Sequence, residues 1–269
     1  QGIKCLTEAE AAVLAGEDPE SHTTDLQRSI DEGDFPSWTL KVQLMPASEA
    51  AGYAINPFDV TKVWPQKDYP LMEVGKLVLD RSPDSFFSDV EQAGFDPGHF
   101  VPGIGPSPDK MLQGRLFAYG DAHRYRLGIN HTQLPVNQPH AVVADNYGRD
   151  GAMRFDANGG MDKNYEPNSF GGPTQSDTPL YSPLESSGPS GAYEWEERDT
   201  DNFTQAGALY RLISIDAQDR LIASISGSLA GVQKTETGDG IVARSIGHFR
   251  QADADFGKRL ESAVTALRG

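Results

Sequence analysis

Ser107-Pro-Asp-Lys-Met-Leu-Gln-Gly-Arg-Leu-Phe-Ala-Tyr-Gly-Asp-Ala-His-Arg-Tyr-Arg-Leu-Gly128 is the stretch from which the organisation of the chain can be inferred. It carries the start and stop signals of a helix. Ser107 is a suitable N-cap, and Pro108 suits a first turn. Arg124 and Arg126 occupy what would be the last turn, where cations are favourable, and Gly128 follows them. The sequence therefore predicts a helix that begins after Ser107 and ends before Gly128.

One face of this predicted helix carries polar chemistry that an ordinary core does not use, because residues three or four positions apart lie on the same side. An Arg one turn before a Tyr can donate to the phenolic oxygen and so favour phenolate over phenol. A phenolate is a hard anionic ligand suited to ferric iron, and a second Arg could pair with a haem propionate. Spacing alone leaves open the alternative of a structural Tyr–Arg pair in a helix packed on a sheet. The face comprises Met111, Arg115, Tyr119, Ala122, His123 and Arg126.

Residues 115–126, Arg-Leu-Phe-Ala-Tyr-Gly-Asp-Ala-His-Arg-Tyr-Arg, resemble the proximal haem motif of monofunctional haem catalases. That motif is Arg, any residue, Phe, a small residue, Tyr, any residue, Asp, Ala or Thr, and Arg at the end. The resemblance is strong from residue 1 to about 173 and weak beyond it. Further segments that resemble the family, in the family's order, are 56–65, 68–71, 74–79, 101–104, 107–114, 135–137, 146–147, 149–151 and 167–170.

The resemblance implies an α+β catalase fold in three parts. Residues 1–128 would form the second half of an antiparallel β-barrel with the proximal haem helix. Residues 129–202 would be a long segment that wraps around neighbouring subunits, and residues 203–269 an all-helical region. The implied protein is a cytoplasmic, homotetrameric catalase of the small-subunit type. It would bind haem b and convert hydrogen peroxide to water and dioxygen.

The resemblance also implies roles for single residues. Tyr119 would be the axial ligand of the haem iron, and Arg115 would keep its phenolate anionic. The remaining haem contacts implied in this way are Phe95, Met111, Ala122, His123 and Arg126.

Catalases of this family also use a distal His and Asn, which lie in the N-terminal half of the subunit. None of the six histidines of this chain lies in the Arg/Val-rich strand that carries the distal His, and the chain begins with Gln1. We therefore expect the chain to be the C-terminal portion of a catalase subunit, completed by its N-terminal portion. The alternative is a haem-binding or structural fragment with no activity of its own.

The segment Val63-Trp64-Pro65 has two interpretations. It is either a packed corner or, by resemblance, part of the NADPH site that many small-subunit catalases have. The next residue is commonly His in the family, whereas here it is Gln66. Because Gln is neutral at every pH, it cannot make the charge-assisted bond that a cationic His makes to a phosphate. We therefore expect NADPH binding to be weak or absent.

Composition excludes several classes of partner. The chain has 269 residues and a formal net charge of −16, which disfavours nucleic acids and anionic membranes. No apolar run approaches the roughly 18 residues of a membrane span. The single cysteine, Cys5, allows no internal disulfide and favours a reducing compartment. The hydrophobic fraction of 38% is low and is compatible with half of a larger core.

Local patterns predict the remaining elements. The capping box Thr7 to Glu10 starts one helix, which Gly16 ends; Thr23 or Thr24 caps a second helix, which Gly33 ends. Alternating residues predict a half-buried strand over 38–45, and an apolar run predicts another over 72–80. A helix is expected over 86–92. Later helices are expected over 203–213, 216–231, 241–252 and 254–267, with Gly238 and Gly240 separating two of them.

Overall fold

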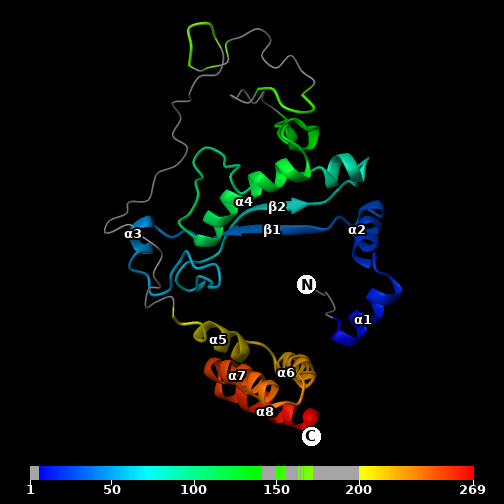
Figure 1. The fold of residues 1–269 in the computed structure, drawn as a ribbon, viewed down its shortest axis with the longest axis vertical. Helices are drawn as coiled ribbons and strands as arrows, with labels where there is room; N and C mark the ends of the chain where they lie inside the picture. Colours follow the sequence, from blue (N-terminus) through cyan, green and yellow to red (C-terminus); the bar gives the residue numbers. More distant parts are fainter. Residues whose placement is uncertain (1–5, 141–148, 155–162, 164, 166, 172–199) are drawn as a thin grey trace. The chain divides into compact units, whose positions relative to one another are not determined.

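The computed structural model describes residues 6–140, 149–154, 163, 165, 167–171 and 200–269. Contacts between Cα atoms divide the chain into two compact units. The first unit comprises residues 1–36, 54–56 and 192–269, and the second comprises residues 37–53 and 57–191. Figure 1 shows the helices and strands of both units. Among the described residues, no helix combines the length and apolar character that crossing a membrane requires.

An antiparallel ribbon of two strands, β1 (Ser37–Val42) and β2 (Met72–Val78), lies in the second unit. Ser37 pairs with Val78 and Val42 with Met72, with one irregularity between Leu40 and Lys41. Both predicted strands are confirmed, although each is shorter than expected. The prediction of a half-buried strand is wrong for β1, where the Trp38 side chain is 53% exposed. Every residue of β2 is exposed as well, so the described residues bury neither face of the ribbon.

Helix α4 (Lys110–Arg126) also belongs to the second unit. Its N-cap is Asp109, whose carboxylate accepts hydrogen bonds from the backbone nitrogens of Met111 at 2.6 Å and Leu112 at 3.3 Å. The prediction that Ser107 caps this helix is therefore wrong, because a carboxylate nearer to the first turn satisfies its N–H groups and complements the helix dipole. The predicted end is confirmed by Gly128, whose φ of +117° is a conformation that favours glycine.

Among the described residues of the second unit, four short helical turns precede or follow α4 in the sequence. They are α3 (Ala47–Ala50), the π-helical turn η1 (Phe87–Glu91), and the 3₁₀ turns η2 (His131–Gln133) and η3 (Pro135–Asn137). The helix expected over 86–92 is thus present as a single π-type turn.

Two N-terminal helices, α1 (Glu8–Glu17) and α2 (Ser21–Asp31), belong to the first unit. The predicted capping box is confirmed: the Thr7 nitrogen donates to Glu10 Oε2 at 2.8 Å, and the Glu10 nitrogen donates to Thr7 Oγ1 at 3.2 Å. The predicted stop at Gly16 is wrong, because this glycine lies inside α1. Gly33, with φ of +79°, does follow the end of α2. The predicted caps Thr23 and Thr24 lie inside α2, which begins after Glu20.

Four C-terminal helices complete the first unit: α5 (Thr204–Leu212), α6 (Ile215–Ala230), α7 (Glu236–Ala252) and α8 (Ala254–Arg268). Ser214 caps α6 through a 3.3 Å hydrogen bond from the nitrogen of Ala217. Helix α7 begins earlier than predicted, because Thr235 caps it and Gly238 lies within its first turn. A Cβ at Gly238 would collide with the carbonyl of Gln233, so glycine is required there for packing and does not end the helix.

The helices α5 to α8 of the first unit pack around one hydrophobic core. Tyr210 and Phe256 stack in it with ring centroids 4.3 Å apart and an interplanar angle of 5°. Leu221, Ile225 and Leu229, which lie on one face of α6, are partly buried and pack against this core. The buried core residues are Tyr210, Ile222, Val242, Ile246, Phe256, Leu260 and Val264.

Candidate functional site

Arg115 and Tyr119 are in contact on helix α4. The Arg115 Cζ atom lies 4.9 Å from the centroid of the Tyr119 ring, which is the geometry of a cation–π interaction. Tyr119 is half-buried, whereas Arg115 is exposed. Within the described part of the chain, no hydrogen bond joins this guanidinium to the phenolic oxygen. The four-residue spacing of Arg115 and Tyr119 thus correctly indicated that the two side chains are neighbours. A hydrogen bond from the Arg115 guanidinium to the phenolic oxygen stays a prediction.

His123 is on the buried side of the same helix, with only 6% of its surface exposed. Its Nε2 atom lies 2.8 Å from the carbonyl oxygen of Phe95. Because a carbonyl only accepts hydrogen bonds, this nitrogen carries the proton. The ring meets the Tyr119 ring edge to face, at 6.0 Å and 70°, and the His131 ring at 5.7 Å. His123 Nδ1 is buried without a hydrogen-bond partner among the described residues.

Arg126 uses its guanidinium to bind backbone. Nη1 donates to the carbonyl of Glu91 and Nη2 to that of Ala93, both at 2.7 Å. The predicted pairing of Arg126 with a haem propionate therefore stays a prediction. Phe95 lies next to this segment, and its side chain is 87% exposed and available for contact.

Asn137 is a residue of this region that the sequence analysis did not assign. Its Oδ1 accepts from the nitrogen of Gly94 at 2.8 Å. Its Nδ2 donates to the carbonyls of Gln92 and His131, each at 3.0 Å. One amide thus satisfies three backbone groups, two before α4 and one after it. The only sequence signal was its place in a turn-rich segment that resembles the family.

The residues of the α4 face fit a ferric porphyrin chemically. Tyr119 is the member of the predicted face that can become an anionic oxygen ligand, and a guanidinium contacts its ring. Met111, Arg115 and Ala122, predicted on the same face, are exposed. The face therefore combines a phenol, a guanidinium and uncovered apolar surface, which are groups that a haem with an axial phenolate could use.

Trp64 lies in a packed corner. Its Nε1 donates to the carbonyl of Pro57 at 3.2 Å, and its ring centroid is 5.7 Å from that of Tyr69. Val63 and Gln66 beside it are exposed. The structure thus agrees with the first interpretation of this segment, and the NADPH site stays a prediction.

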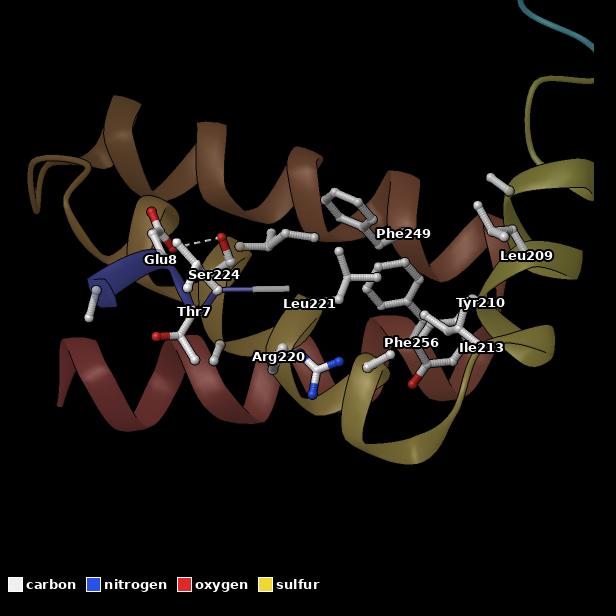
Figure 2. Close-up of a pocket in the computed structure, with 16 residues that line it drawn as sticks. Thr7, Glu8, Leu209, Tyr210, Ile213, Arg220, Leu221, Ser224, Phe249 and Phe256 are labelled. Atoms are coloured by element: carbon white, nitrogen blue, oxygen red, sulfur yellow. Dashed lines mark hydrogen bonds between the residues drawn. The ribbon is translucent and has the colours of Figure 1, made fainter. Parts of the chain in front are cut away.

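A groove of about 840 Å³ lies in the first unit, and none of the predicted site residues lines it. Figure 2 shows it bordered by the start of α1 and by the helices α5 to α8. Its walls are mainly apolar, with Leu209, Ile213 and Phe249 among them. At one end the Ser224 hydroxyl donates to Glu8 Oε2 at 2.9 Å. The groove holds none of the side chains predicted to bind iron.

Comparison with known proteins identifies relatives for the whole chain. The family model described as Catalase matches residues 1–172, and the one described as Catalase-related immune-responsive matches residues 195–264. A Catalase of Streptomyces coelicolor is 60% identical over 271 residues, covering 100% of this chain and 55% of the relative. A Bromoperoxidase-catalase of Streptomyces venezuelae is 59% identical, with coverage of 100% and 55%. The chain thus spans about half the length of the curated relatives it matches.

Solved structures give the same result at the level of the fold. Catalase A from Saccharomyces cerevisiae has a TM-score of 0.88 and 38% sequence identity, covering 97% of this chain and 54% of that chain. A bacterial catalase has a TM-score of 0.85 and 36% identity, with coverage of 98% and 54%.

Proposed function

Because the chain belongs to the catalase family, we propose that it forms the proximal haem side of an enzyme that converts two molecules of hydrogen peroxide into two of water and one of dioxygen. The observation that carries this proposal is the contact between Arg115 and Tyr119 on an exposed face of α4. A Tyr phenolate is one of the axial ligands that haem iron takes in proteins, and a nearby cation favours the anionic form of the Tyr side chain.

In this proposal each residue has a defined task. The haem supplies the redox chemistry when it is bound. Tyr119 binds the iron through its phenolate oxygen, and Arg115 holds a positive charge against the Tyr119 ring. Phe95, Met111 and Ala122 offer contact surface to the macrocycle, and Arg126 is a further candidate for contact. Cleavage of peroxide also needs an acid/base pair, which we place in residues outside these 269.

The finer features of the assembly belong to the same proposal. We expect haem b, a homotetramer and a cytoplasmic location, with β1 and β2 as part of an antiparallel barrel. The division into residues 1–128, 129–202 and 203–269 is retained as a proposal. Most of the expected wrapping segment, 129–202, lies outside the described residues.

A second candidate is a haem-binding or structural catalase fragment with no activity of its own. The observation that favours it is the length of the chain, which spans about half of its curated relatives. The two candidates differ in dioxygen evolution and agree on haem binding.

Substitution of Tyr119 tests the proposed ligand in the full-length, haem-loaded protein. Tyr119→Phe removes the phenolic oxygen, so we expect loss of haem or a changed axial ligand in the ferric spectrum, together with loss of dioxygen evolution. Tyr125→Phe is the matched control, because Tyr125 lies on the same helix and is 94% exposed. A Tyr119→Phe protein with the wild-type spectrum and full turnover would refute the proposal.

NADPH is expected to bind weakly or not at all, because Gln66 replaces a potentially cationic His. The loss of one charge-assisted hydrogen bond corresponds to roughly ten- to a hundred-fold in affinity. Fluorescence of the protein as purified, followed by calorimetric titration, measures this directly. Stoichiometric NADPH that survives purification would show that Gln66 is an adequate replacement.

A further inference from the structure

We propose that His123 and Asn137 are positioning residues that fix the iron ligand Tyr119 relative to the segment 91–95, which carries Phe95. This inference rests on the proposed function, because it concerns how the proposed haem ligand is held. It differs from the expectation that His123 contacts the haem, since the His123 ring is buried within the protein.

The C-terminal end of α4 is tied to the segment 91–95 by three hydrogen bonds. His123 Nε2 lies 2.8 Å from the Phe95 oxygen, and Arg126 reaches the oxygens of Glu91 and Ala93 at 2.7 Å each. The C-terminal end of α4 thus binds the carbonyls of every second residue in this segment, namely 91, 93 and 95. Neither side can slide along the other without breaking these bonds, and loss of the His123 bond would leave the N–H of a buried ring unsatisfied.

Asn137 ties the same segment to the turn that follows α4. It accepts from the Gly94 nitrogen at 2.8 Å and donates to the oxygens of Gln92 and His131 at 3.0 Å. His131 is itself buried and lies 3.0 Å, through Nδ1, from the oxygen of Gly128. The segment before α4 and the turn after it are therefore joined around the end of the helix.

Packing transmits this fixed geometry to Tyr119. The His123 ring lies one turn after Tyr119 and meets the tyrosine ring edge to face. The ring is also close to Gly94, where an added Cβ would lie 3.6 Å from His123 Cγ and 3.3 Å from Leu127 Cδ1. A shift of the segment would therefore press on His123 and, through it, on the iron ligand. Partners of this kind orient the groups that bind a metal.

The test compares variants of the full-length protein in their haem affinity and ferric absorption spectrum. His123→Phe keeps an aromatic ring beside Tyr119 but removes the N–H donor to Phe95. We expect its haem affinity to fall about two- to tenfold, the effect of one hydrogen bond, and its ferric bands to shift. His123→Gln restores a side-chain N–H donor and should recover most of both. His99→Phe, at an exposed histidine, is the control.

A second variant removes no hydrogen bond. Gly94→Ala adds only a methyl group against Leu127 and His123, and we expect a shift of the ferric bands in the same direction as in His123→Phe. Gly52→Ala is its control, because nothing lies within 4 Å of a Cβ there. If His123→Phe yields no folded protein, Gly94→Ala decides the question by itself.

The possible failures are distinguishable. A Tyr119→Phe protein that keeps the wild-type spectrum would overturn the proposed function. If Tyr119→Phe loses haem while His123→Phe and Gly94→Ala match their controls, only the positioning role is overturned. A His123→Gln protein as defective as His123→Phe would also overturn it, because the donor to Phe95 would then be irrelevant.

Discussion

At the scale of single residues, the Arg115–Tyr119 contact shows how one spacing permits two interactions. Residues four apart on a helix are neighbours, so an Arg can reach either the oxygen or the ring of the following Tyr. Here the guanidinium lies over the ring, 4.9 Å from its centroid. A cation over the ring face is attracted by the negative side of the quadrupole. The proposed ligand thus has a positive neighbour in contact with its ring.

Asp253 has two structural roles, as the N-cap of α8 and as the ion-pair partner of Arg211. It accepts from the nitrogens of Asp255 at 2.9 Å and Phe256 at 3.2 Å. Its other oxygen accepts from Arg211 Nη1 at 2.7 Å. The Arg211 guanidinium, followed by the backbone donors, holds the pKa of Asp253 below its ordinary value.

We predict that Asp253→Asn lowers stability in a pH-dependent way. Asn is an equally good N-cap, so the variant loses only the ion pair, about 0.2–1 kcal/mol at neutral pH because Arg211 is exposed. Since the folded pKa is lowered, the carboxylate stabilises the fold above its unfolded pKa of about 3.9 and loses this effect as the pH falls through the folded value. The difference between wild type and variant should therefore shrink below about pH 4.

Denaturant unfolding at a series of pH values measures this difference. Asp253→Ala is the companion variant, because it also removes the N-cap. It should lower the free energy of unfolding by about a further 0.5–2 kcal/mol. A wild-type to Asn difference that stays constant from neutral to acid pH would contradict the assigned role of the Asp253 charge.

At the scale of elements, local signals predicted helices and their caps where one residue decides the outcome. The Thr7 capping box was predicted correctly because a side-chain oxygen a few residues from free N–H groups has few alternative partners. Glycine was less informative. Gly33 ends a helix because it adopts positive φ, whereas Gly16 and Gly238 remain helical, and sequence does not distinguish these cases.

The local part of the candidate site could be predicted from the sequence, whereas its long-range connections could not. Helical spacing and the family-like motif identified Arg115 and Tyr119 as neighbours, and the contact between them confirms this. The connections of Gly94 and Asn137 could not be predicted, because they join side chains to backbone atoms about forty positions away, 43 for Gly94–Asn137. Local periodicity contains no information about such pairs.

Crossing helices give a prediction in which two glycines have opposite effects. Gly257 of α8 packs against Arg250 of α7, and an added Cβ would overlap the Arg250 backbone. Gly227 of α6 has nothing within 4 Å of an added Cβ. We expect Gly257→Ala to lower the free energy of unfolding by about 1–3 kcal/mol. Gly227→Ala should raise it by about 0.5–1 kcal/mol, because alanine favours helix.

Unfolding of both variants in denaturant provides the measurement, and each serves as the control for the other. Effects of the same sign would show that helix propensity, and not the close approach of α7 and α8, decides stability at these positions.

At the scale of the whole molecule, burial is distributed unevenly. The helices α5 to α8 enclose a core, whereas the β1–β2 ribbon leaves apolar side chains exposed. Trp38 and Leu77 are opposite each other in the register, and both are exposed. The strand pattern predicted an apolar face correctly, but it could not reveal whether these residues bury that face. This is why the expectation of a half-buried strand was wrong for the described residues.

The exposed ribbon gives the last prediction, which concerns residues 1–269 expressed alone. Exposed apolar strands and unpaired strand edges promote association, so we expect this polypeptide to bind a hydrophobic dye and to self-associate. Leu77→Lys, on the ribbon, should reduce both. Leu212→Lys is the control, because Leu212 is 82% exposed but lies in α5 of the other unit. The polypeptide should also evolve no dioxygen from peroxide, because we place the acid/base pair elsewhere. A monodisperse preparation of residues 1–269 that evolves dioxygen would contradict both the role of the ribbon and the placement of that pair.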